Sequence, residues 1–248
     1  MEKYSPENEL IPLKKEEPLV LDTITHYTSI PVLFKILRNN QILFNRIDNV
    51  NDLEEKDNLM KHENYQRVFI SCFSTQNNES IPMWRMYTNK DTGIMLKIKF
   101  LKGITVDNLF FKDYMSTSDG EKISIIPQRI NSSSVGVQFD TLKIVYTDKM
   151  VRSPIMTVDE GKKDYDVPAY FAMEKSSAWR YEKEIRFRAV LREWGFGNDE
   201  IPEVSRLFAR INFNAIEKIT VVFNPWIDKD DWADIIKEFV SKQKIVFE

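Results

Sequence analysis

The chain has 248 residues, of which 42% are hydrophobic, and its formal net charge is -3. This length and apolar content suffice for a buried core, and 16 phenylalanines predict that aromatic rings form much of that core. The slightly negative charge excludes a global basic field that would draw the protein to nucleic acid or to an anionic membrane.

Glycine and cysteine are both scarce, which narrows the kinds of site that the chain can form. The seven glycines make neither a GxGxxG nor a GxxxxGK pattern, and this argues against a dinucleotide fingerprint or a phosphate-binding loop. Cys72 is the single cysteine, so an internal disulfide is excluded, and no HExxH-like spacing indicates a metal site. Since we find no signal-peptide pattern and no membrane-length apolar run, we expect a cytoplasmic protein without a membrane partner.

The first half of the chain predicts an arm followed by alternating strands and helices. Three prolines among Lys and Glu residues indicate that residues 1–20 form an arm, and we expect one globular domain over residues 21–248. Ser29 and Pro31 are typical of a helix start, and the expected buried stripe of that helix is Ile30, Leu33, Phe34 and Leu37. Apolar runs predict strands over 21–27, 41–44, 68–73 and 93–100, a polar helix from Asp52 to about residue 65, and a short helix over 81–87.

The second half contains more strands and two further helices. Residues 112–138 are rich in Ser, Asp, Asn and Gly, so we interpret them as a surface excursion. We expect strands over 142–146, 184–191, 219–223 and 244–247, a helix over 165–177 and another after Asp228. Strands outnumber helices and are irregularly interspersed, which favours a single α+β domain with mixed or antiparallel sheets.

The residues from Glu182 onward alternate between charged and apolar side chains. Glu182, Glu184, Arg186 and Arg188 would lie on one side of a strand, opposite the apolar Ile185, Phe187 and Ala189. Two carboxylates that project in parallel could both contact one substrate. The alternative is a strand stabilised by cross-strand salt bridges, which are common.

Three other segments carry polar or aromatic residues without an obvious place in the core. His26 lies in a strand-like run and could be structural or catalytic. Trp84 and Tyr87 are one helical turn apart and could cover a cleft, or they could both be core aromatics. For Asn51 and Asp52 we favour a helix cap over a functional role.

The chain resembles the uncharacterised bacterial domain-of-unknown-function family 2971 over about residues 24–225. The resemblance rests on an ordered set of motifs, Asn51-Asp52-x-Glu54, Met83-Trp84-x-x-Tyr87 with Gly93-Ile94, and Lys175-x-x-x-Trp179-x-Tyr181-Glu182-x-Glu184-x-Arg186. The last motif is the most specific of the three. The family name implies relatedness and supplies no activity.

A more distant resemblance is to the ADP-ribosyltransferase superfamily, and it implies a split sheet that binds NAD. His26 on an early strand, Tyr87 on a short helix and Glu184 on a late strand are similar to the His-Tyr-Glu branch. Glu182-x-Glu184 and the segment Phe73-Ser74-Thr75 are similar to the Glu-x-Glu and Ser-Thr motifs of the Arg-Ser-Glu branch. The chain therefore mixes the patterns of both branches.

The resemblance implies catalytic roles for two carboxylates. Cleavage of the nicotinamide–ribose bond develops positive charge on the ribose, and a fixed carboxylate stabilises it. Glu184 would hold the ribose in this way, and Glu182 would orient or deprotonate the acceptor.

The resemblance also implies a set of NAD-binding residues around these carboxylates. Tyr87 would stack on nicotinamide, His26 would hydrogen-bond the ribose, and Arg186 would pair with Glu184 or bind the diphosphate. Tyr27, Ser74 and Trp84 would complete the NAD site. Trp179 and Tyr181 would form the rim where the acceptor arrives.

We therefore expect an enzyme that transfers ADP-ribose or hydrolyses NAD, with an acceptor that the sequence does not identify. By analogy, such a bacterial protein could be a toxin or a phage-defence effector. The first alternative is a non-catalytic module that binds a nucleotide or protein through Trp84, Tyr87, Trp179 and Arg186. The second is a Mg²⁺-dependent nuclease that uses Asp52, Glu54 and Glu182, although the net charge speaks against it.

Overall fold

The computed structural model describes residues 21–61, 64–125, 134–148, 171–194, 204–227, 232 and 245–247. The expected arm over residues 1–20 and the expected helix after Asp228 lie outside these described residues, apart from Trp232. Within them the α-helices are α1 (Ile30–Asn39), α2 (Leu53–Met60) and α3 (Ile81–Tyr87). None of the helices in this part of the chain has the length and apolar character needed to cross a membrane.

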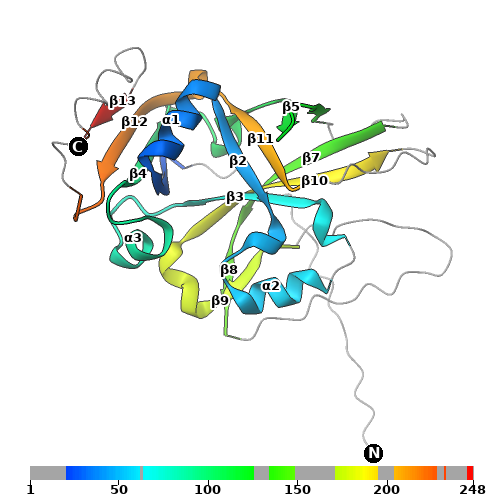
Figure 1. The fold of residues 1–248 in the computed structure, drawn as a ribbon, viewed down its shortest axis with the longest axis horizontal. Coiled ribbons are helices and arrows are strands. Elements are labelled where there is room, and N and C mark those ends of the chain that lie inside the picture. The colour runs from blue at the N-terminus through cyan, green and yellow to red at the C-terminus, as the bar shows by residue number, and fades with distance from the viewer. Residues whose placement is uncertain are drawn as a thin grey trace, which may run out of the picture.

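β-Strands are the predominant secondary structure of the described chain, and nearly all of their pairing is antiparallel (Figure 1). The strands are β1 (Thr23–Ser29), β2 (Gln41–Arg46), β3 (Val68–Ser74), β4 (Gly93–Phe100), β5 (Phe110–Thr117), β6 (Lys122–Ser124), β7 (Ser134–Lys143), β8 (Val145–Thr147), β9 (Glu174–Ser176), β10 (Glu184–Trp194), β11 (Arg206–Ile211), β12 (Ile216–Phe223) and β13 (Ile245–Phe247). The predicted α+β class is confirmed at this level.

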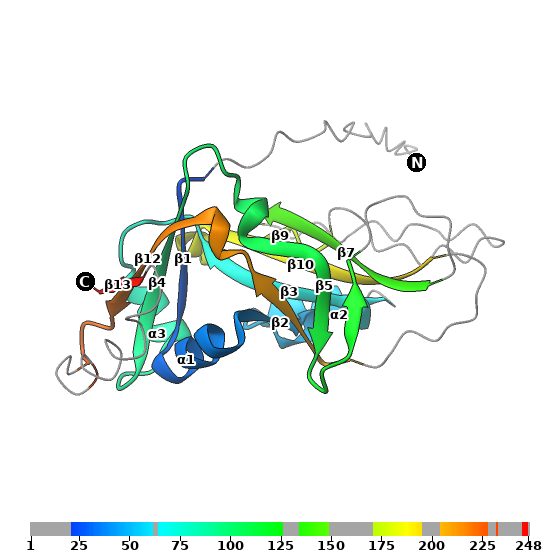
Figure 2. The same ribbon diagram turned by 90° about the horizontal axis from the view of Figure 1, so that it is seen from above.

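Eleven of these strands form one branched sheet. Its main path runs β13-β12-β4-β1-β3-β2-β11-β5-β6, while β10 pairs with β3 on its other edge and with β7 beyond. The short strands β8 and β9 pair in parallel as a separate sheet. Figure 2 shows β1 and β4 running across the direction of β7 and β10.

Strand β3 is the point where the main sheet divides. On one edge it pairs with β10 along its whole length. On the other edge Ser74 pairs with Thr25 of β1, whereas Phe69 and Ile70 pair with β2. The residues between these contacts, Ser71 to Phe73, have no strand partner on that edge in the described part of the chain, so β1 and β2 diverge and leave a gap above β3.

Local sequence signals account for the elements that surround this gap. Helix α1 begins after Ser29, with Pro31 in its first turn, and ends at Asn40, whose left-handed backbone lets its N–H donate to the carbonyl of Ile36. Strand β4 begins at Gly93 because a Cβ there would lie 2.5 Å from the carbonyl oxygen of Asn89. The close return after α3 therefore depends on a glycine.

Aromatic rings fill the core, as the composition predicted. Phe110 packs edge-on against Phe44 and Phe187 with ring centroids 5.5 and 4.9 Å apart, and Phe187 packs in the same way on Phe73 at 5.2 Å. Offset or edge-on pairs of this kind add stability beyond the area that they bury. The apolar face of β10, which carries Phe187, therefore packs in the core.

Several sequence predictions about the second half of the chain are wrong. The expected surface excursion over 112–138 contains most of β5, all of β6 and the start of β7, and β11 was not predicted. The described end of the expected 165–177 helix is strand β9. Pairing with β10 and β11 makes strands of segments whose polar composition is typical of loops.

The prediction that Glu182 lies on the same strand face as Glu184 is also wrong. It ends a 3-10 helix over Ser177–Glu182, and Lys183 then takes a left-handed conformation with φ 45° before β10 begins at Glu184. Glu182 and Glu184 are therefore not neighbours on one strand face. The alternation of Glu184, Arg186 and Arg188 against the apolar side is confirmed.

Candidate active site

A cavity of about 270 Å³ lies in the gap between β1 and β2, with β3 as its floor. It is lined by Thr25, His26, Tyr27, Asn45, Arg46, Asn49, Val50, Asn51, Ile70, Ser71, Cys72, Phe73, Ser74, Met83, Tyr87, Lys175, Glu182, Glu184 and Arg186. Most of the predicted site residues thus come together, although they come from segments that are far apart in the sequence. A cavity of this size lies just under the ~300–1,000 Å³ range of ligand pockets, so it can enclose a ring and a sugar but not a whole dinucleotide.

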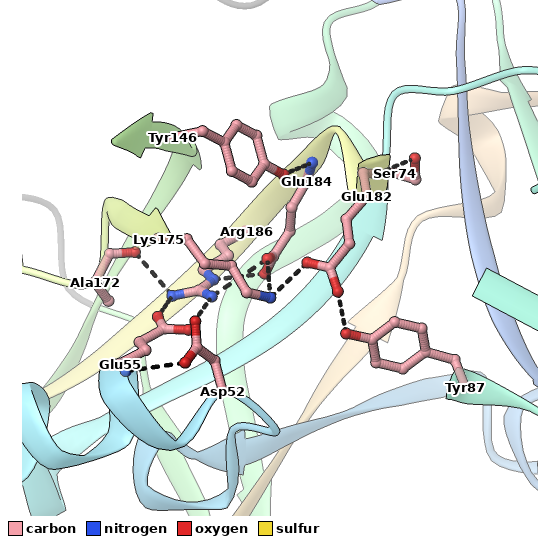
Figure 3. Close-up of polar contacts among 10 residues, drawn as sticks. All are labelled: Asp52, Glu55, Ser74, Tyr87, Tyr146, Ala172, Lys175, Glu182, Glu184 and Arg186. Carbon is pink, nitrogen blue, oxygen red and sulfur yellow. Dashed lines mark hydrogen bonds and ion pairs between the residues drawn. The ribbon is translucent and has the colours of Figure 1, made fainter. Parts of the chain in front are cut away.

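Five charged side chains beside this cavity form a chain of alternating sign (Figure 3). Arg186 donates through both terminal nitrogens to Glu55 and through Nε to Oε1 of Glu184 at 2.5 Å. The ammonium group of Lys175 lies 3.1 Å from Oε2 of Glu184 and 2.5 Å from Oε2 of Glu182. The order is therefore Glu55, Arg186, Glu184, Lys175 and Glu182, with an acid at each end.

All five residues are nearly removed from water, with between 0 and 5% of their surface exposed. The five side chains comprise three carboxylates and two cations, so together they carry one negative charge in excess when every group is ionised. Burial of so many charges costs several kcal/mol per ion before the ion pairs repay it. The excess negative charge lies at the two ends of this row of five side chains, because Glu55 and Glu182 each contact only one cation. Glu182 is the end that lines the cavity.

The two acids that line the cavity have pKa values displaced in opposite directions. Burial raises the pKa of Glu182, and the neighbouring charge of Glu184 raises it further, against the lowering effect of Lys175. Burial would also raise the pKa of Glu184, but the charges of Arg186 and Lys175 outweigh it and bring that pKa to about 2. One carboxylate is thus held ionised while its neighbour takes up a proton more readily, a division typical of paired catalytic acids.

The residues around Glu182 close one end of the cavity. The Tyr87 hydroxyl donates to Oε1 of Glu182, and Ser74 donates to the Glu182 backbone carbonyl at 2.5 Å. His26 Nδ1–H donates to the carbonyl of Cys72 at 2.9 Å, in the part of β3 whose edge towards β1 and β2 has no strand partner among the described residues. Burial lowers the pKa of His26, so at neutral pH the ring is held uncharged.

The other predicted aromatic residues have structural contacts. Trp84 is buried against Tyr27 with ring centroids 5.0 Å apart and donates to Glu79, and it does not line the cavity, which favours the core interpretation. Tyr27 lines the cavity, and its hydroxyl also accepts the Ser80 N–H at 3.0 Å. Trp179 lies over the ammonium of Lys175 at 4.8 Å. Tyr181 packs against the apolar cluster that contains Trp84, and neither Trp179 nor Tyr181 lines the cavity.

Of the three acids that a Mg²⁺-dependent nuclease would need, Glu182 lines the cavity, whereas Asp52 and Glu54 do not. Asp52 caps α2 by accepting the N–H groups of Glu54 and Glu55 at 3.0 and 3.2 Å, as we favoured. Glu54 itself is exposed. In the ranges that the structure describes, no three or more His, Cys, Asp or Glu side chains gather as a potential metal site. The nuclease hypothesis therefore gains no support.

Sequence reasoning missed three residues that hold the carboxylates in place. Lys175 stands at the start of the most specific motif, and that position was its only signal. Glu55 follows the noted Asp52 and Glu54 but looked like an ordinary polar position on a helix. Tyr146 accepts the Glu184 N–H at 2.7 Å, and burial raises the pKa of its hydroxyl to about 12.

Comparison with known proteins gives one match. Residues 83–187 match the model of the family described as "Protein of unknown function (DUF2971)", a range that runs from α3 to β10 and contains Tyr87, Lys175, Glu182 and Glu184. No curated protein and no solved structure matched the chain. This match confirms the resemblance of the chain to the DUF2971 family.

Proposed function

We propose that the protein is an ADP-ribosyltransferase-like enzyme that cleaves the nicotinamide–ribose bond of NAD. The observation that carries the proposal is the convergence of His26, Tyr87, Glu182 and Glu184 on one cavity. Each of the four comes from a different element, and the resemblance to that superfamily predicted that they would meet. The divergence of β1 and β2 from β3 is compatible with the split sheet of such a fold.

The charge of the site also suits this chemistry. Nicotinamide in NAD is a cationic ring, and the ribose gains positive charge as the glycosidic bond breaks. The buried chain of charges has one negative charge in excess, with Glu182 facing the cavity. Preorganised charge of the opposite sign is commonly the largest catalytic contribution in such a site.

The reaction that we propose divides the work between the two acids. The C1′–N1 bond breaks, its electron pair leaves with neutral nicotinamide, and the ionised Glu184 stabilises the ribosyl cation through its fixed negative charge. A hydroxyl group of the acceptor or of water attacks C1′, and Glu182 takes the proton that this hydroxyl loses. The raised pKa of Glu182 brings it closer to neutral pH, where a general base is most effective.

Nicotinamide release from NAD by the purified protein tests this proposal. We expect release by the wild type and a loss of about a hundredfold or more in Glu184→Gln, because that substitution removes the fixed charge. Glu217→Gln on the surface is the matched control and should have no effect. No release from the wild type, together with no NAD-dependent rise in melting temperature, would favour a module that binds another ligand.

The biological setting is a further part of the proposal. An NAD-consuming activity located in the cytoplasm would deplete or modify central components of a cell. Such an activity would fit a toxin or a phage-defence effector, and this rests on analogy alone.

A further inference from the structure

We propose that the end of the cavity formed by β2 and the residues after it binds the phosphate next to the nicotinamide ribose, which fixes the direction in which NAD enters. This inference rests on the proposed function and assigns a role to Asn45, Arg46, Asn49 and Asn51. These residues line the same cavity as the two catalytic acids. In the sequence, Asn51 indicates only a helix cap, and the other three residues carry no signal of a functional role.

The side chains at this end are donors without competing partners, apart from Arg46. The side-chain amide groups of Asn45, Asn49 and Asn51 have no hydrogen-bond partner in the described part of the chain. Arg46 is held in place by Asp48, to which its Nε and Nη2 donate at 3.0 and 2.8 Å. Arginine and asparagine side chains are common ligands of phosphate oxygens in proteins.

The stretch of β3 that lines the cavity is long enough for a nicotinamide, ribose and phosphate laid along it. Ile70 pairs with β2 and Ser74 pairs with β1, so four residue steps of about 3.3 Å separate the two ends by about 13 Å. Ring, sugar and phosphate in sequence need about this span. The adenosine half of NAD would then lie outside the enclosed volume of about 270 Å³.

The charges at the two ends allow one direction of binding. At the β1 end, Glu182 faces the cavity beside Tyr87 and the apolar Met83, which suits a cationic ring. At the β2 end, Arg46 lines the cavity, and Asp48 beside it offsets part of its charge. A ligand with a cationic ring and an anionic phosphate therefore binds with its ring at Glu182 and its phosphate at Arg46.

Binding of a series of ligand fragments to the full chain tests this assignment. The probes are carbocyclic analogues of nicotinamide riboside, nicotinamide mononucleotide and NAD, in which a CH₂ group replaces the ribose ring oxygen so that the bond is not cleaved. Calorimetry would compare the wild type with Asn49→Ala and Arg46→Gln. Asn78→Ala, at an exposed position that does not line the cavity, is the matched control.

We expect the mononucleotide and NAD to bind about three- to tenfold more weakly to Asn49→Ala and at least about tenfold more weakly to Arg46→Gln. Riboside affinity should stay within about twofold of wild type in both variants, and Asn78→Ala should change none of the three. Equal losses for riboside and mononucleotide, or no loss at all, would overturn the assignment. A loss confined to NAD would mean that this end binds the adenosine half instead.

The same series separates the failure of this inference from that of the proposed function. If none of the three analogues binds to the wild type, the proposed function fails and the inference falls with it. If the riboside binds as tightly as the mononucleotide, only the phosphate assignment fails. Melting temperatures of all variants within a few degrees of wild type would show that the fold is retained.

Discussion

Replacement of Arg186 by methionine should be among the most destabilising single changes in this protein. Arg186 is 1% exposed and donates hydrogen bonds to Glu55, to Glu184 and to the carbonyl oxygen of Ala172. Its removal leaves the fully buried carboxylate of Glu55 without a cation, while Glu184 keeps Lys175. The loss of one partner from a buried ion pair costs about 3–5 kcal/mol.

This cost should be visible in both chemical and thermal unfolding. For a chain of this length, each kcal/mol lowers the melting temperature by about 2–4 °C, so Arg186→Met should melt on the order of 10 °C lower. Removal of both charges in Arg186→Met/Glu55→Leu should restore most of the loss, because no buried charge is then left unpaired. Urea unfolding followed by circular dichroism gives the free energy of unfolding of each variant.

A surface ion pair provides the comparison for this experiment. Lys99 lies 2.7 Å from Glu217, but their side chains are 51% and 44% exposed, so Lys99→Met should cost only about 0–1 kcal/mol. If Arg186→Met costs no more than Lys99→Met, the buried chain of charges does not stabilise the fold as argued. A double variant that is no more stable than Arg186→Met alone would refute the pairing with Glu55.

Three other predictions concern the site and its surroundings. The pKa of Glu184 is held at about 2 against an ordinary value of 4.5, so its contribution to stability is present above pH 4.5 and lost as the pH falls towards 2. In acid titrations Glu184→Gln should therefore lose less stability than the wild type over this interval, and parallel curves of stability against pH would contradict this. Tyr87→Phe removes a hydrogen bond that lowers the pKa of Glu182, so the pH at half-maximal NAD cleavage should rise, and an unmoved pH profile would argue against Glu182 as the base. Trp84→Phe should cost about 1–3 kcal/mol through lost packing and its bond to Glu79, with NAD affinity unchanged; weaker binding by a fully folded variant would place Trp84 in the site after all.

Local signals in the sequence were sufficient to predict the bounds of an element where one residue type determines the backbone conformation. Strand β4 was predicted with both of its ends because Gly93 and the apolar run after it are unambiguous. Strand β5 was missed because its apolar residues do not alternate with polar ones, and its pairing with β11 decides its conformation. Strand β11 itself alternates, with Leu207, Ala209 and Ile211 buried, so its signal was present and overlooked.

The candidate site was predictable only in part, because its geometry depends on a break in the strand. The alternation correctly placed Glu184 and Arg186 on one face of β10. It could not show that the left-handed Lys183 turns the chain between Glu182 and Glu184. The burial of Glu55 depends on how α2 packs near β10, and no local pattern reports such a contact.

The cost of the buried charges is itself an argument that the cavity is functional. A protein gains little net stability from buried ion pairs, since well-packed apolar residues of similar volume are often as stable or better. Here the charges lie where β1 and β2 diverge from β3, and the row of five charged side chains ends with Glu182 at the cavity. Each cation in the chain contacts two acids, so Glu55 and Arg186 fix the position of Glu184, and Lys175 fixes Glu182 in turn. An apolar core could fill the same space, but it could not hold two carboxylates with different pKa values side by side against a ligand.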